Sequence, residues 1–337
     1  MVEKAIILTG SSCSGKTTYA KYLEKTEGYK YINFDSLYNY AKPRSLNYNF
    51  NKLKTAVKGS EKIILDGYWS WRDNNFKLFK EEICNDVQNI VTIVTINELA
   101  KRRTARYEKF NSDEPIQEVN YYINDLPQRI SFKDSEFINT SDNTFKRVII
   151  NSPDELNEYL IKINKKDFKN YLDTLTYDKL YRDIKCIDFK GYSQSEKSWE
   201  SIKDLVDWWG KHVIELGCFH GYFSFQIDKQ DTVVTGLDCN ENIINTTKFI
   251  NWLENSHVSF KCWTGGEDIP CCDIILCMNV LHHFKGKQEL VLSKMDCKQV
   301  IFEINKEEIP LISKYFKIIK EVKSHRPNRT ILLGEKL

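Results

Sequence analysis

The chain has little net charge, no long hydrophobic run and no repeated or low-complexity segment. Its 337 residues include 49 basic and 47 acidic side chains, which leaves a net charge of +2. Composition alone therefore requires no polyanionic partner, although a local basic patch can exist within a neutral total. No stretch approaches eighteen apolar residues, so we expect no transmembrane helix and no membrane insertion. The first strand-like segment begins at Ala5, which leaves no room for a secretory signal.

Zinc-type cysteine pairs are also missing. Ten cysteines occur, but none form Cys-x-x-Cys units with the spacing of zinc sites, so we expect free and mostly buried thiols. A metal cluster at Cys271, Cys272 and Cys277 is the alternative. The content of 41% hydrophobic and 13% aromatic residues indicates a globular protein. A chain of 337 residues suits two domains of about 150 residues each.

Short apolar runs alternate with helical stretches in two parts of the chain. In the first part, strands are expected at 5–9, 31–34, 62–65, 90–94 and 147–150, and helices at 16–25, 49–58, 115–125 and 153–163. In the second part, strands are expected at 212–216, 233–237, 257–261, 272–277, 299–303 and 329–333. This spacing is typical of βαβ units around a buried parallel sheet. We therefore predict an α/β fold with two doubly wound domains, residues 1–163 and 201–337, and a connector at 164–200.

The first predicted strand runs into a loop with the Walker A pattern, Gly10-x4-Gly15-Lys16-Thr17. Glycines let the backbone turn so that successive N–H groups converge on phosphate oxygens, and the following helix directs its positive end toward the same anion. Lys16 is expected to reach the β- and γ-phosphates of ATP, and Thr17 to ligate Mg²⁺. The predicted ATP-binding residues are Gly10, Ser12, Ser14, Gly15, Lys16, Thr17 and Thr18. The alternative is a Gly/Ser turn that matches by chance, and the flanking strand and helix argue against it.

Two aspartates and two arginines extend this site. Asp35 and Asp66 each follow a predicted strand, and strand ends in an open parallel sheet face the ligand crevice. We expect Asp35 to be the general base toward an attacking hydroxyl and Asp66 to be the acid that holds Mg²⁺; either can instead be a turn or cap residue. Arg102 and Arg106 share one helical face. They are expected to fold over the triphosphate and neutralise developing charge, with a solvated basic face as the alternative.

These segments resemble the chloramphenicol phosphotransferase-like and polynucleotide 5′-kinase-like P-loop kinases over roughly residues 1–150. The resemblance rests on Ile7–Ser12, Gly15-Lys16, Phe34–Leu37 and Ile64–Asp66. It implies a kinase in which Asp35 is the general base. Polynucleotide kinases tend to carry an arginine shortly after that aspartate, whereas Leu37, Tyr38 and Asn39 stand here. This departure favours a smaller or sugar-like alcohol over a nucleic acid as the phosphate acceptor.

A second glycine loop lies in the other half of the chain. The pattern Glu215-x-Gly217-x3-Gly221 follows one predicted strand, and Asp238 ends the next. Glycine is needed where the backbone passes close beneath a cofactor, and an acid at the second strand end can accept both ribose hydroxyls. A dinucleotide needs a fuller glycine pattern for its pyrophosphate, whereas a bulky Phe219 is tolerable under a nucleoside. We predict that Glu215, Gly217, Gly221 and Asp238 bind S-adenosylmethionine.

Two later segments add to this second site. Glu267 and Asp268 follow the third predicted strand, where one of them can hydrogen-bond an adenine amine. Asn279 and His283 follow the buried strand 272–277. The order of segments resembles class I S-adenosylmethionine-dependent methyltransferases over residues 200–337. It departs from their pattern where the usual middle glycine of the first motif is replaced by a phenylalanine.

Two pairs of basic residues are candidates for contact with the methyl acceptor. His283, or its neighbour His282, is a candidate base because imidazole titrates near neutrality; packing is the alternative. Arg326 and Arg329, just before the last predicted strand, can hold a phosphate of the acceptor, or else belong to a solvated hairpin. An anionic acceptor needs no base, because attack then rests on proximity and orientation.

The two sites together predict a cytoplasmic bifunctional enzyme. It phosphorylates a hydroxyl of a sugar, glycan or small molecule with ATP and Mg²⁺ and methylates the same molecule, on the new phosphate or elsewhere, because fusion raises local concentration. The methyltransferase half also resembles that of kinase–methyltransferases that end bacterial O-polysaccharide chains, through Gly221–Ser224 and Leu281–His283. Alternatives are a nucleic acid 5′-end kinase and methyltransferase with salt-dependent binding, a protein with one domain acting only as a sensor, and two unrelated enzymes joined together.

Overall fold

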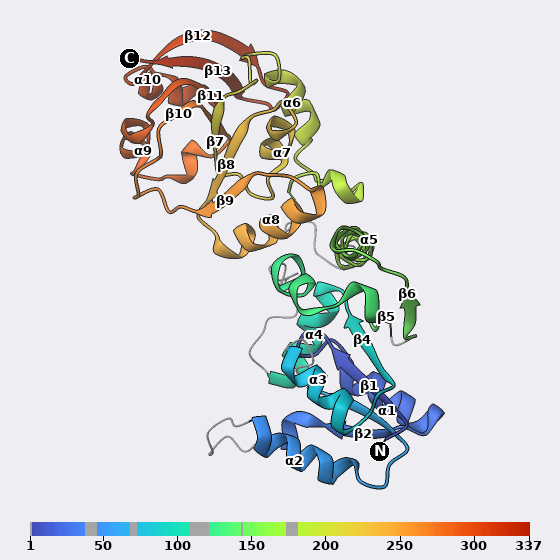
Figure 1. Ribbon diagram of the computed structural model, residues 1–337. Coiled ribbons are helices and arrows are strands. Elements are labelled where there is room, and N and C mark those ends of the chain that lie inside the picture. The colour runs from blue at the N-terminus through green and yellow to red at the C-terminus, as the bar shows by residue number, and fades with distance from the viewer. Residues whose placement is uncertain (1, 38–45, 68–72, 108–120, 143, 173–180) are drawn as a thin grey trace. The chain divides into compact units, whose positions relative to one another are not determined.

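The computed structural model describes residues 2–37, 46–67, 73–107, 121–142, 144–172 and 181–337 (Figure 1). The described residues form two compact units, one up to Asn164 and the other from Lys165 onward. Each unit contains one sheet with helices, so the predicted α/β architecture is present in both. The domain boundaries that we drew from the sequence stay predictions. Residues 115–120 of a predicted helix lie outside the described part of the chain.

The first unit contains a six-stranded sheet in the order β2-β3-β1-β4-β5-β6. Neighbouring strands are parallel except β5 and β6, which are antiparallel. The strands are β1 (Lys4–Thr9), β2 (Lys30–Asn33), β3 (Lys62–Asp66), β4 (Val87–Ile93), β5 (Ser135–Asn139) and β6 (Lys146–Val148). The helices are α1 (Lys16–Glu27), α2 (Leu46–Val57), α3 (Asp73–Glu82), α4 (Ile96–Tyr107) and α5 (Pro153–Leu172).

Strand β1 is buried on both faces, as the continuous apolar run Ala5–Leu8 predicts. Ala5 and Ile7 belong to a cluster with side chains of α2 and α3, and Ile6 and Leu8 belong to a second cluster with side chains of α1. Helices therefore cover both sides of the sheet. The order of the strands places the loop after β1 between the ends of β3 and β4, where parallel sheets of this kind bind ligands.

Three elements of the first unit differ from the prediction. Strand β5 was not predicted, because its sequence is polar at both ends and only Phe137 and Ile138 are buried. The strand expected at 147–150 is the short edge strand β6, which ends at Val148 and runs antiparallel to β5. Helix α5 continues past its predicted end at residue 163 to Leu172.

The second unit contains a seven-stranded sheet in the order β12-β13-β11-β10-β7-β8-β9. Strands β11, β10, β7, β8 and β9 are parallel, while β13 runs antiparallel between β11 and β12. The strands are β7 (His212–Leu216), β8 (Val233–Asp238), β9 (Ser259–Cys262), β10 (Cys272–Met278), β11 (Cys297–Asn305), β12 (Phe316–Lys323) and β13 (Arg329–Lys336). The helices are α6 (Ser195–Ile202), α7 (Tyr222–Asp228), α8 (Glu241–Glu254), α9 (Gln288–Lys294) and α10 (Ile309–Ile312).

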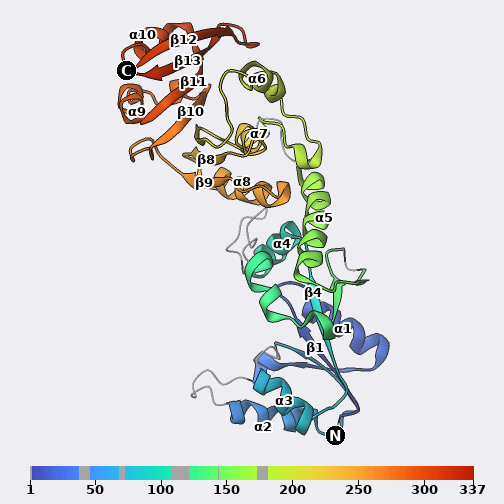
Figure 2. The ribbon, with the colours of Figure 1, turned by 45° about the horizontal axis from the view of Figure 1, so that its top comes forward.

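The order of strands in the second unit reverses between β7 and β10. From β7 the chain proceeds outward to β8 and β9, and from β10 it proceeds in the other direction to β11. In both views α9 and α10 lie on one side of the sheet, while α7 and α8 lie on the other (Figures 1 and 2). A topological switch point of this kind opens a crevice beyond the carboxyl ends of β7 and β10. Strand β12 was not predicted, because most of its residues are exposed.

The cysteines are free thiols, five of them buried and three of them exposed. The exposed ones, Cys239, Cys262 and Cys271, depart from the expectation of mostly buried thiols. Within the described residues, no group of three His, Cys, Asp or Glu side chains is arranged to hold a metal ion. Across the same ranges, no helix has the length and the apolar character that crossing a membrane requires.

Candidate functional sites

The loop between β1 and α1 requires glycine at both of its ends. Gly10 has φ 150° and Gly15 has φ 89°. A Cβ atom on Gly10 would lie 2.4 Å from Oγ1 of Thr92, and one on Gly15 would lie 2.8 Å from Oγ1 of Thr140. Because real Cβ atoms do not approach other atoms so closely, a side chain at either position would force the loop out of this shape.

The first turn of α1 offers backbone N–H groups for an anion. Gly15 is the N-cap and provides no side-chain hydrogen bond to that turn, and a helix N-terminus of this kind can bind an anion through its backbone N–H groups. The Lys16 ammonium lies over the loop and donates to the carbonyl oxygens of Gly10 at 3.1 Å and Ser11 at 2.8 Å. Of the other predicted ATP-binding residues, Ser14 is buried, while Ser12, Thr17 and Thr18 are exposed.

Thr17 and Asp66 form a pair of oxygen donors beside this loop. The Thr17 hydroxyl donates to Oδ2 of Asp66 at 2.6 Å. The pair arises because β3 lies next to β1 with Leu8 opposite Asp66, and Asp66 is buried at the end of its strand. Hydroxyl and carboxylate oxygens are the ligands that Mg²⁺ prefers, so this donor set fits the predicted ion.

Asp35 lies in a 3-10 turn, Phe34–Leu37, that follows β2. Strand β2 pairs with β3 through Asn33 and Asp66, which puts the backbone of Asp35 two residues beyond that pair. Its side chain lies outside the described residues, so its role as a general base stays a prediction.

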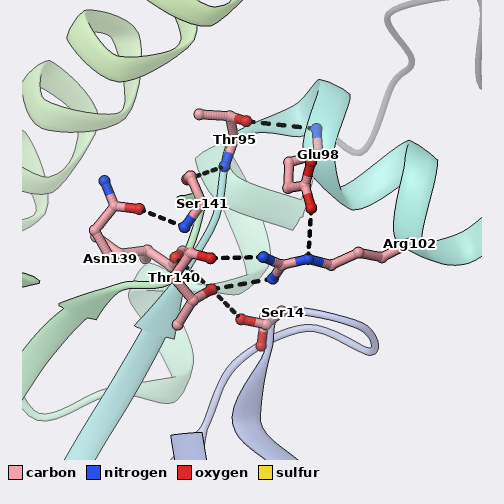
Figure 3. A network of polar contacts seen from close by, with 8 residues as sticks. Ser14, Thr95, Glu98, Arg102, Asn139, Thr140 and Ser141 are labelled. Atoms are coloured by element: carbon pink, nitrogen blue, oxygen red, sulfur yellow. Dashed lines mark hydrogen bonds and ion pairs between the residues drawn. The ribbon is translucent and has the colours of Figure 1, made fainter. Parts of the chain in front are cut away.

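Arg102 is held against the glycine loop by a network of polar contacts (Figure 3). Its Nε donates to Glu98 at 2.9 Å, and its two terminal nitrogens donate to Oγ1 of Thr140 at 3.2 Å and to the carbonyl oxygen of Thr140 at 2.6 Å. Thr140 in turn donates to the carbonyl oxygen of Ser14 at 2.6 Å. The structure therefore brings Arg102 to the loop, whereas Arg106 is exposed one turn further along α4.

Thr140 is a site residue that the sequence reasoning missed. It follows β5 directly, and it connects that strand, the arginine of α4 and the glycine loop in one network. Strand β5 was not recognised in the sequence, because it carries only two buried apolar residues. Nothing in the sequence therefore placed Thr140 at the end of a strand beside the site.

In the second unit, the loop after β7 also depends on glycine. Gly217 has φ 66° and Gly221 has φ 74°. A Cβ atom on Gly217 would lie 2.4 Å from Cγ2 of Val280, and one on Gly221 would lie 2.8 Å from the Phe260 ring. Phe219, which replaces the usual middle glycine, adopts φ 49°, so the loop keeps a left-handed turn at that position without a glycine.

Asp238 connects this loop to the start of α8. Its Oδ2 accepts a hydrogen bond from the backbone N–H of Phe219 at 3.0 Å, and its Oδ1 accepts one from the N–H of Asn240 at 3.0 Å. Asn240 caps α8 through its own side chain. The carboxylate is thus fixed by backbone groups on both sides.

A cavity of about 770 Å³ opens beside these residues, a volume typical of ligand sites. Four of the predicted cofactor and catalytic residues line it, namely Gly217, Asp238, Asn279 and His283. Side chains that the sequence did not single out for the cofactor also line it, among them Tyr181, Arg182, Tyr192, Trp263, Phe284 and Arg326. Tyr181, Arg182 and Tyr192 come from the predicted connector, which carries no motif.

Asn279 presents an unsatisfied oxygen in this cavity. Its Nδ2 donates to the Tyr181 hydroxyl at 3.3 Å, but its buried Oδ1 has no hydrogen-bond partner in the described part of the chain. A buried carbonyl oxygen without a donor costs free energy unless a ligand supplies the donor. This atom therefore fits a cofactor that carries an amino or hydroxyl group.

Glu215 and Gly221 do not line the cavity. Glu215 is buried, and its Oε2 accepts hydrogen bonds from the backbone N–H of Ser224 at 2.8 Å and from its hydroxyl at 2.5 Å. Burial raises the pKa of Glu215 to about 7, against the opposing effect of the buried guanidinium of Arg182. Gly221 instead packs against Phe225 and Phe260.

Glu267 and Asp268 are also absent from the cavity wall. Glu267 accepts hydrogen bonds from the backbone N–H groups of Thr264 and Gly266, so it closes its own turn. Asp268 has a side chain that is 97% exposed and forms an ion pair with Lys294 at 3.2 Å. Their predicted contact with adenine stays a prediction, and the nearby wall is formed by Trp263 and Thr264.

His282 and His283 both line the cavity, with ring centroids 4.0 Å apart. Burial, followed by the neighbouring ring of His283 and the guanidinium of Arg329, lowers the pKa of His282. The imidazole of His282 is therefore neutral near pH 7 and can accept a proton.

No protein-family model matches the chain. It is 29% identical over 93 residues to a ubiquinone biosynthesis O-methyltransferase of Coxiella burnetii, which covers 27% of this chain and 40% of that protein. It is 31% identical over 90 residues to a tRNA U34 carboxymethyltransferase of Nautilia profundicola, which covers 25% of this chain and 30% of that protein. The chain thus spans less than half the length of the curated relatives that it matches.

Solved structures give two further matches. Magnesium protoporphyrin IX methyltransferase of Synechocystis PCC 6803, with bound S-adenosylmethionine, is 16% identical, has a TM-score of 0.40 and covers 51% of this chain and 97% of its own. The bifunctional kinase-methyltransferase WbdD is 17% identical, has a TM-score of 0.33 and covers 42% of this chain and 37% of its own. On the curated matches, the C-terminal region resembles class I S-adenosylmethionine-dependent methyltransferases.

Proposed function

We propose that the second unit is a methyltransferase that uses S-adenosylmethionine. The observation that carries this proposal is one cavity that combines the left-handed Gly217, the fixed carboxylate of Asp238 and the unsatisfied oxygen of Asn279. An acid at the end of the second strand suits the two ribose hydroxyls of a nucleoside. The unsatisfied amide oxygen suits an amino group of the methionine part.

Each cavity residue has a chemical role in this proposal. When bound, S-adenosylmethionine supplies an electrophilic methyl group. Asp238 orients the ribose, Asn279 accepts a hydrogen bond from the cofactor, and the ring of Tyr181, packed against Tyr192 at 5.0 Å and Phe219 at 5.9 Å, excludes water. His282, neutral near pH 7, or the predicted base His283, takes the proton of a hydroxyl acceptor.

The first unit is proposed to be an ATP-dependent kinase. The glycine loop, the first turn of α1 and Lys16 suit the β- and γ-phosphates, and Thr17 with Asp66 suits Mg²⁺. Arg102, fixed by Glu98 and Thr140, supplies positive charge beside the loop without the entropy cost of ordering a mobile side chain. Asp35 remains the proposed base toward the acceptor hydroxyl.

The acceptor is proposed to be a sugar, glycan or small molecule that both units modify. The chain carries a net charge of only +2, and the arginine expected for a nucleic acid acceptor is absent after Asp35. In this scheme a hydroxyl is first converted to a phosphomonoester, and the same molecule is then methylated.

One experiment tests both activities. The full chain is incubated with γ-labelled ATP, Mg²⁺ and a panel of sugars, nucleosides and 5′-hydroxyl oligonucleotides, and S-adenosylmethionine is then added. Label transfer to a sugar is expected, and label that becomes phosphatase-resistant only with the methyl donor identifies the phosphate as the methylated group. Transfer to oligonucleotides alone would replace the proposed acceptor with a nucleic acid end.

Matched variants separate the two units. Lys16→Ala should abolish label transfer, while Lys21→Ala, an exposed lysine on the same helix, should not. Asp238→Asn should weaken S-adenosylmethionine binding measured by calorimetry, while Asp231→Asn, an exposed acid before β8, should leave it unchanged. Binding of neither ligand by well-folded wild-type protein would end both proposals.

A further inference from the structure

A second cavity, of about 810 Å³, adjoins the first in the second unit. Its wall is formed by the end of β11, the residues after it and the β12–β13 hairpin. Arg326 lines both cavities. A molecule bound in the second cavity can therefore extend past this arginine toward the cofactor cavity.

Positive charge dominates the wall of this second cavity. Four cationic side chains and two carboxylates line it, namely Lys306, Lys323, Arg326, Arg329, Glu307 and Glu321. One carboxylate is already engaged, because Glu321 accepts a hydrogen bond from the hydroxyl of Thr330 at 2.8 Å. The wall is therefore suited to a ligand with more than one negative charge.

Arg326 is fixed at the junction of the two cavities. One terminal nitrogen donates to the carbonyl oxygen of Ser193 at 3.2 Å, and its Nε lies 3.8 Å from the buried carboxylate of Glu303. Its guanidinium lies 5.4 Å from the centre of the Tyr181 ring. These contacts hold the guanidinium in one orientation, so that little conformational entropy is lost when it binds a ligand.

Arg329, on the wall of the second cavity, has an unsatisfied nitrogen. Its Nη1 is buried and has no hydrogen-bond partner among the residues that the structure describes. Its backbone N–H donates to the carbonyl oxygen of Arg326 at 3.4 Å, so the two arginines belong to one turn of the hairpin. Two guanidinium groups that line one cavity, each with a nitrogen that has no hydrogen-bond partner among the described residues, favour an oxyanion that can bridge them.

We propose that the second cavity is the subsite for a phosphomonoester group of the methyl acceptor, with Arg326 and Arg329 as its ligands. The role as an acceptor subsite rests on the proposed methyltransferase function, whereas the binding of the anion does not. A phosphomonoester carries up to two negative charges and three oxygens, which match the two guanidinium groups. It is also the kind of group that the proposed kinase reaction forms.

The test measures binding of inorganic phosphate by calorimetry. Because the glycine loop of the first unit also suits phosphate, all measurements use the full chain with Lys16→Ala. Arg329→Gln and Arg326→Gln are each expected to weaken phosphate binding about tenfold, the usual effect of losing a charge-assisted contact. Lys320→Gln removes an exposed charge from the same hairpin outside the cavity, and it should leave the affinity nearly unchanged.

Two further measurements make the outcome decisive. Binding of S-adenosylmethionine to Arg329→Gln shows that the second unit is still folded. If the wild-type chain binds the cofactor but the Lys16→Ala chain binds no phosphate, or if Lys320→Gln weakens phosphate as much as Arg329→Gln does, the subsite is refuted while the proposed function stands. Tighter binding of acetate than of phosphate would assign the cavity to carboxylates instead.

Discussion

Replacing His220 with phenylalanine should change how the stability of the second unit depends on pH. His220 is buried between Phe219 and Gly221, and its Nδ1 has no hydrogen-bond partner within the described ranges. Burial lowers the pKa of this imidazole from 6.5 to about 4. The unfolded chain therefore binds a proton below pH 6.5 that the folded chain binds only near pH 4.

The magnitude follows from this difference in proton binding. Because the unfolded chain binds more protons in this window, the free energy of unfolding falls as the pH falls. Each pH unit of the window costs about 1.4 kcal/mol. The loss contributed by His220 is thus about 2 kcal/mol at pH 5 and about 3 kcal/mol below pH 4.

Glu215 changes stability in the opposite direction. Its folded-state pKa is raised to about 7 from 4.5, so the unfolded chain releases this proton first and stability falls as the pH rises from 4.5 to 7. In the wild-type chain the effects of His220 and Glu215 on the free energy of unfolding offset one another. The pH dependence of the wild type alone therefore reveals neither effect. The difference between the wild type and His220→Phe removes the effect of Glu215 and isolates the imidazole.

The assay is urea unfolding between pH 5 and 8, followed by tryptophan fluorescence. Five of the seven tryptophans belong to the second unit, so its transition dominates the signal. The free energy of unfolding of the wild type minus that of His220→Phe should fall by about 2 kcal/mol from pH 8 to pH 5. His257→Phe, at an exposed histidine of the same unit, is the control. A constant difference for His220→Phe across this range would show that the imidazole is not buried as described.

Three further predictions concern the ligands. Gly217→Ala should weaken S-adenosylmethionine binding at least tenfold by calorimetry, because the new Cβ would lie 2.4 Å from Val280; unchanged affinity would contradict the loop geometry. Thr17→Ala should lower the affinity for ATP measured with Mg²⁺ but not with EDTA, because the hydroxyl lies 2.6 Å from Asp66. An equal loss of ATP affinity under both conditions would show that the Thr17 hydroxyl does not ligate the ion. S-adenosylmethionine at a hundredfold its Kd should stabilise the second unit by about 2.7 kcal/mol in urea unfolding, and the transition of the first unit should not move.

The strands with continuous apolar runs were predictable from the sequence, while β5 and β12, which have few buried apolar residues, were not. The apolar runs of β1, β3, β7 and β10 sit between helices on both faces, so hydrophobicity alone marks them. Strand β12 alternates lysines with isoleucine and valine and is largely exposed. Its place is determined by pairing with β13, and a pairing partner leaves no signal in the local sequence.

The candidate sites divide in the same way. Gly15 and Gly217 were predictable because a tight turn near a ligand requires glycine, and the structure confirms that neither position has room for a side chain. Tyr181 and Arg182 were not predictable as cofactor-site residues, because they reach the cavity only after the connector packs on the second unit. The contact of Glu267 or Asp268 with adenine, expected from their place after a strand, stays a prediction, and the carboxylate of Glu267 accepts hydrogen bonds from its own turn.

The two glycine loops differ in the charged groups beside them. At the first loop, the helix N-terminus has no side-chain cap and Lys16 lies over the turn, so the local potential is positive and suits polyphosphate. At the second loop, the carboxyl group of Glu215 accepts the N–H of Ser224 in the first turn of α7. Asp238 likewise accepts the backbone N–H of Phe219, so two N–H groups of this loop and its helix already have acidic side chains as acceptors instead of an anionic ligand. Two loops with similar glycine spacing therefore differ in how well they suit a phosphate, because a lysine lies over one loop while acidic side chains engage backbone N–H groups of the other.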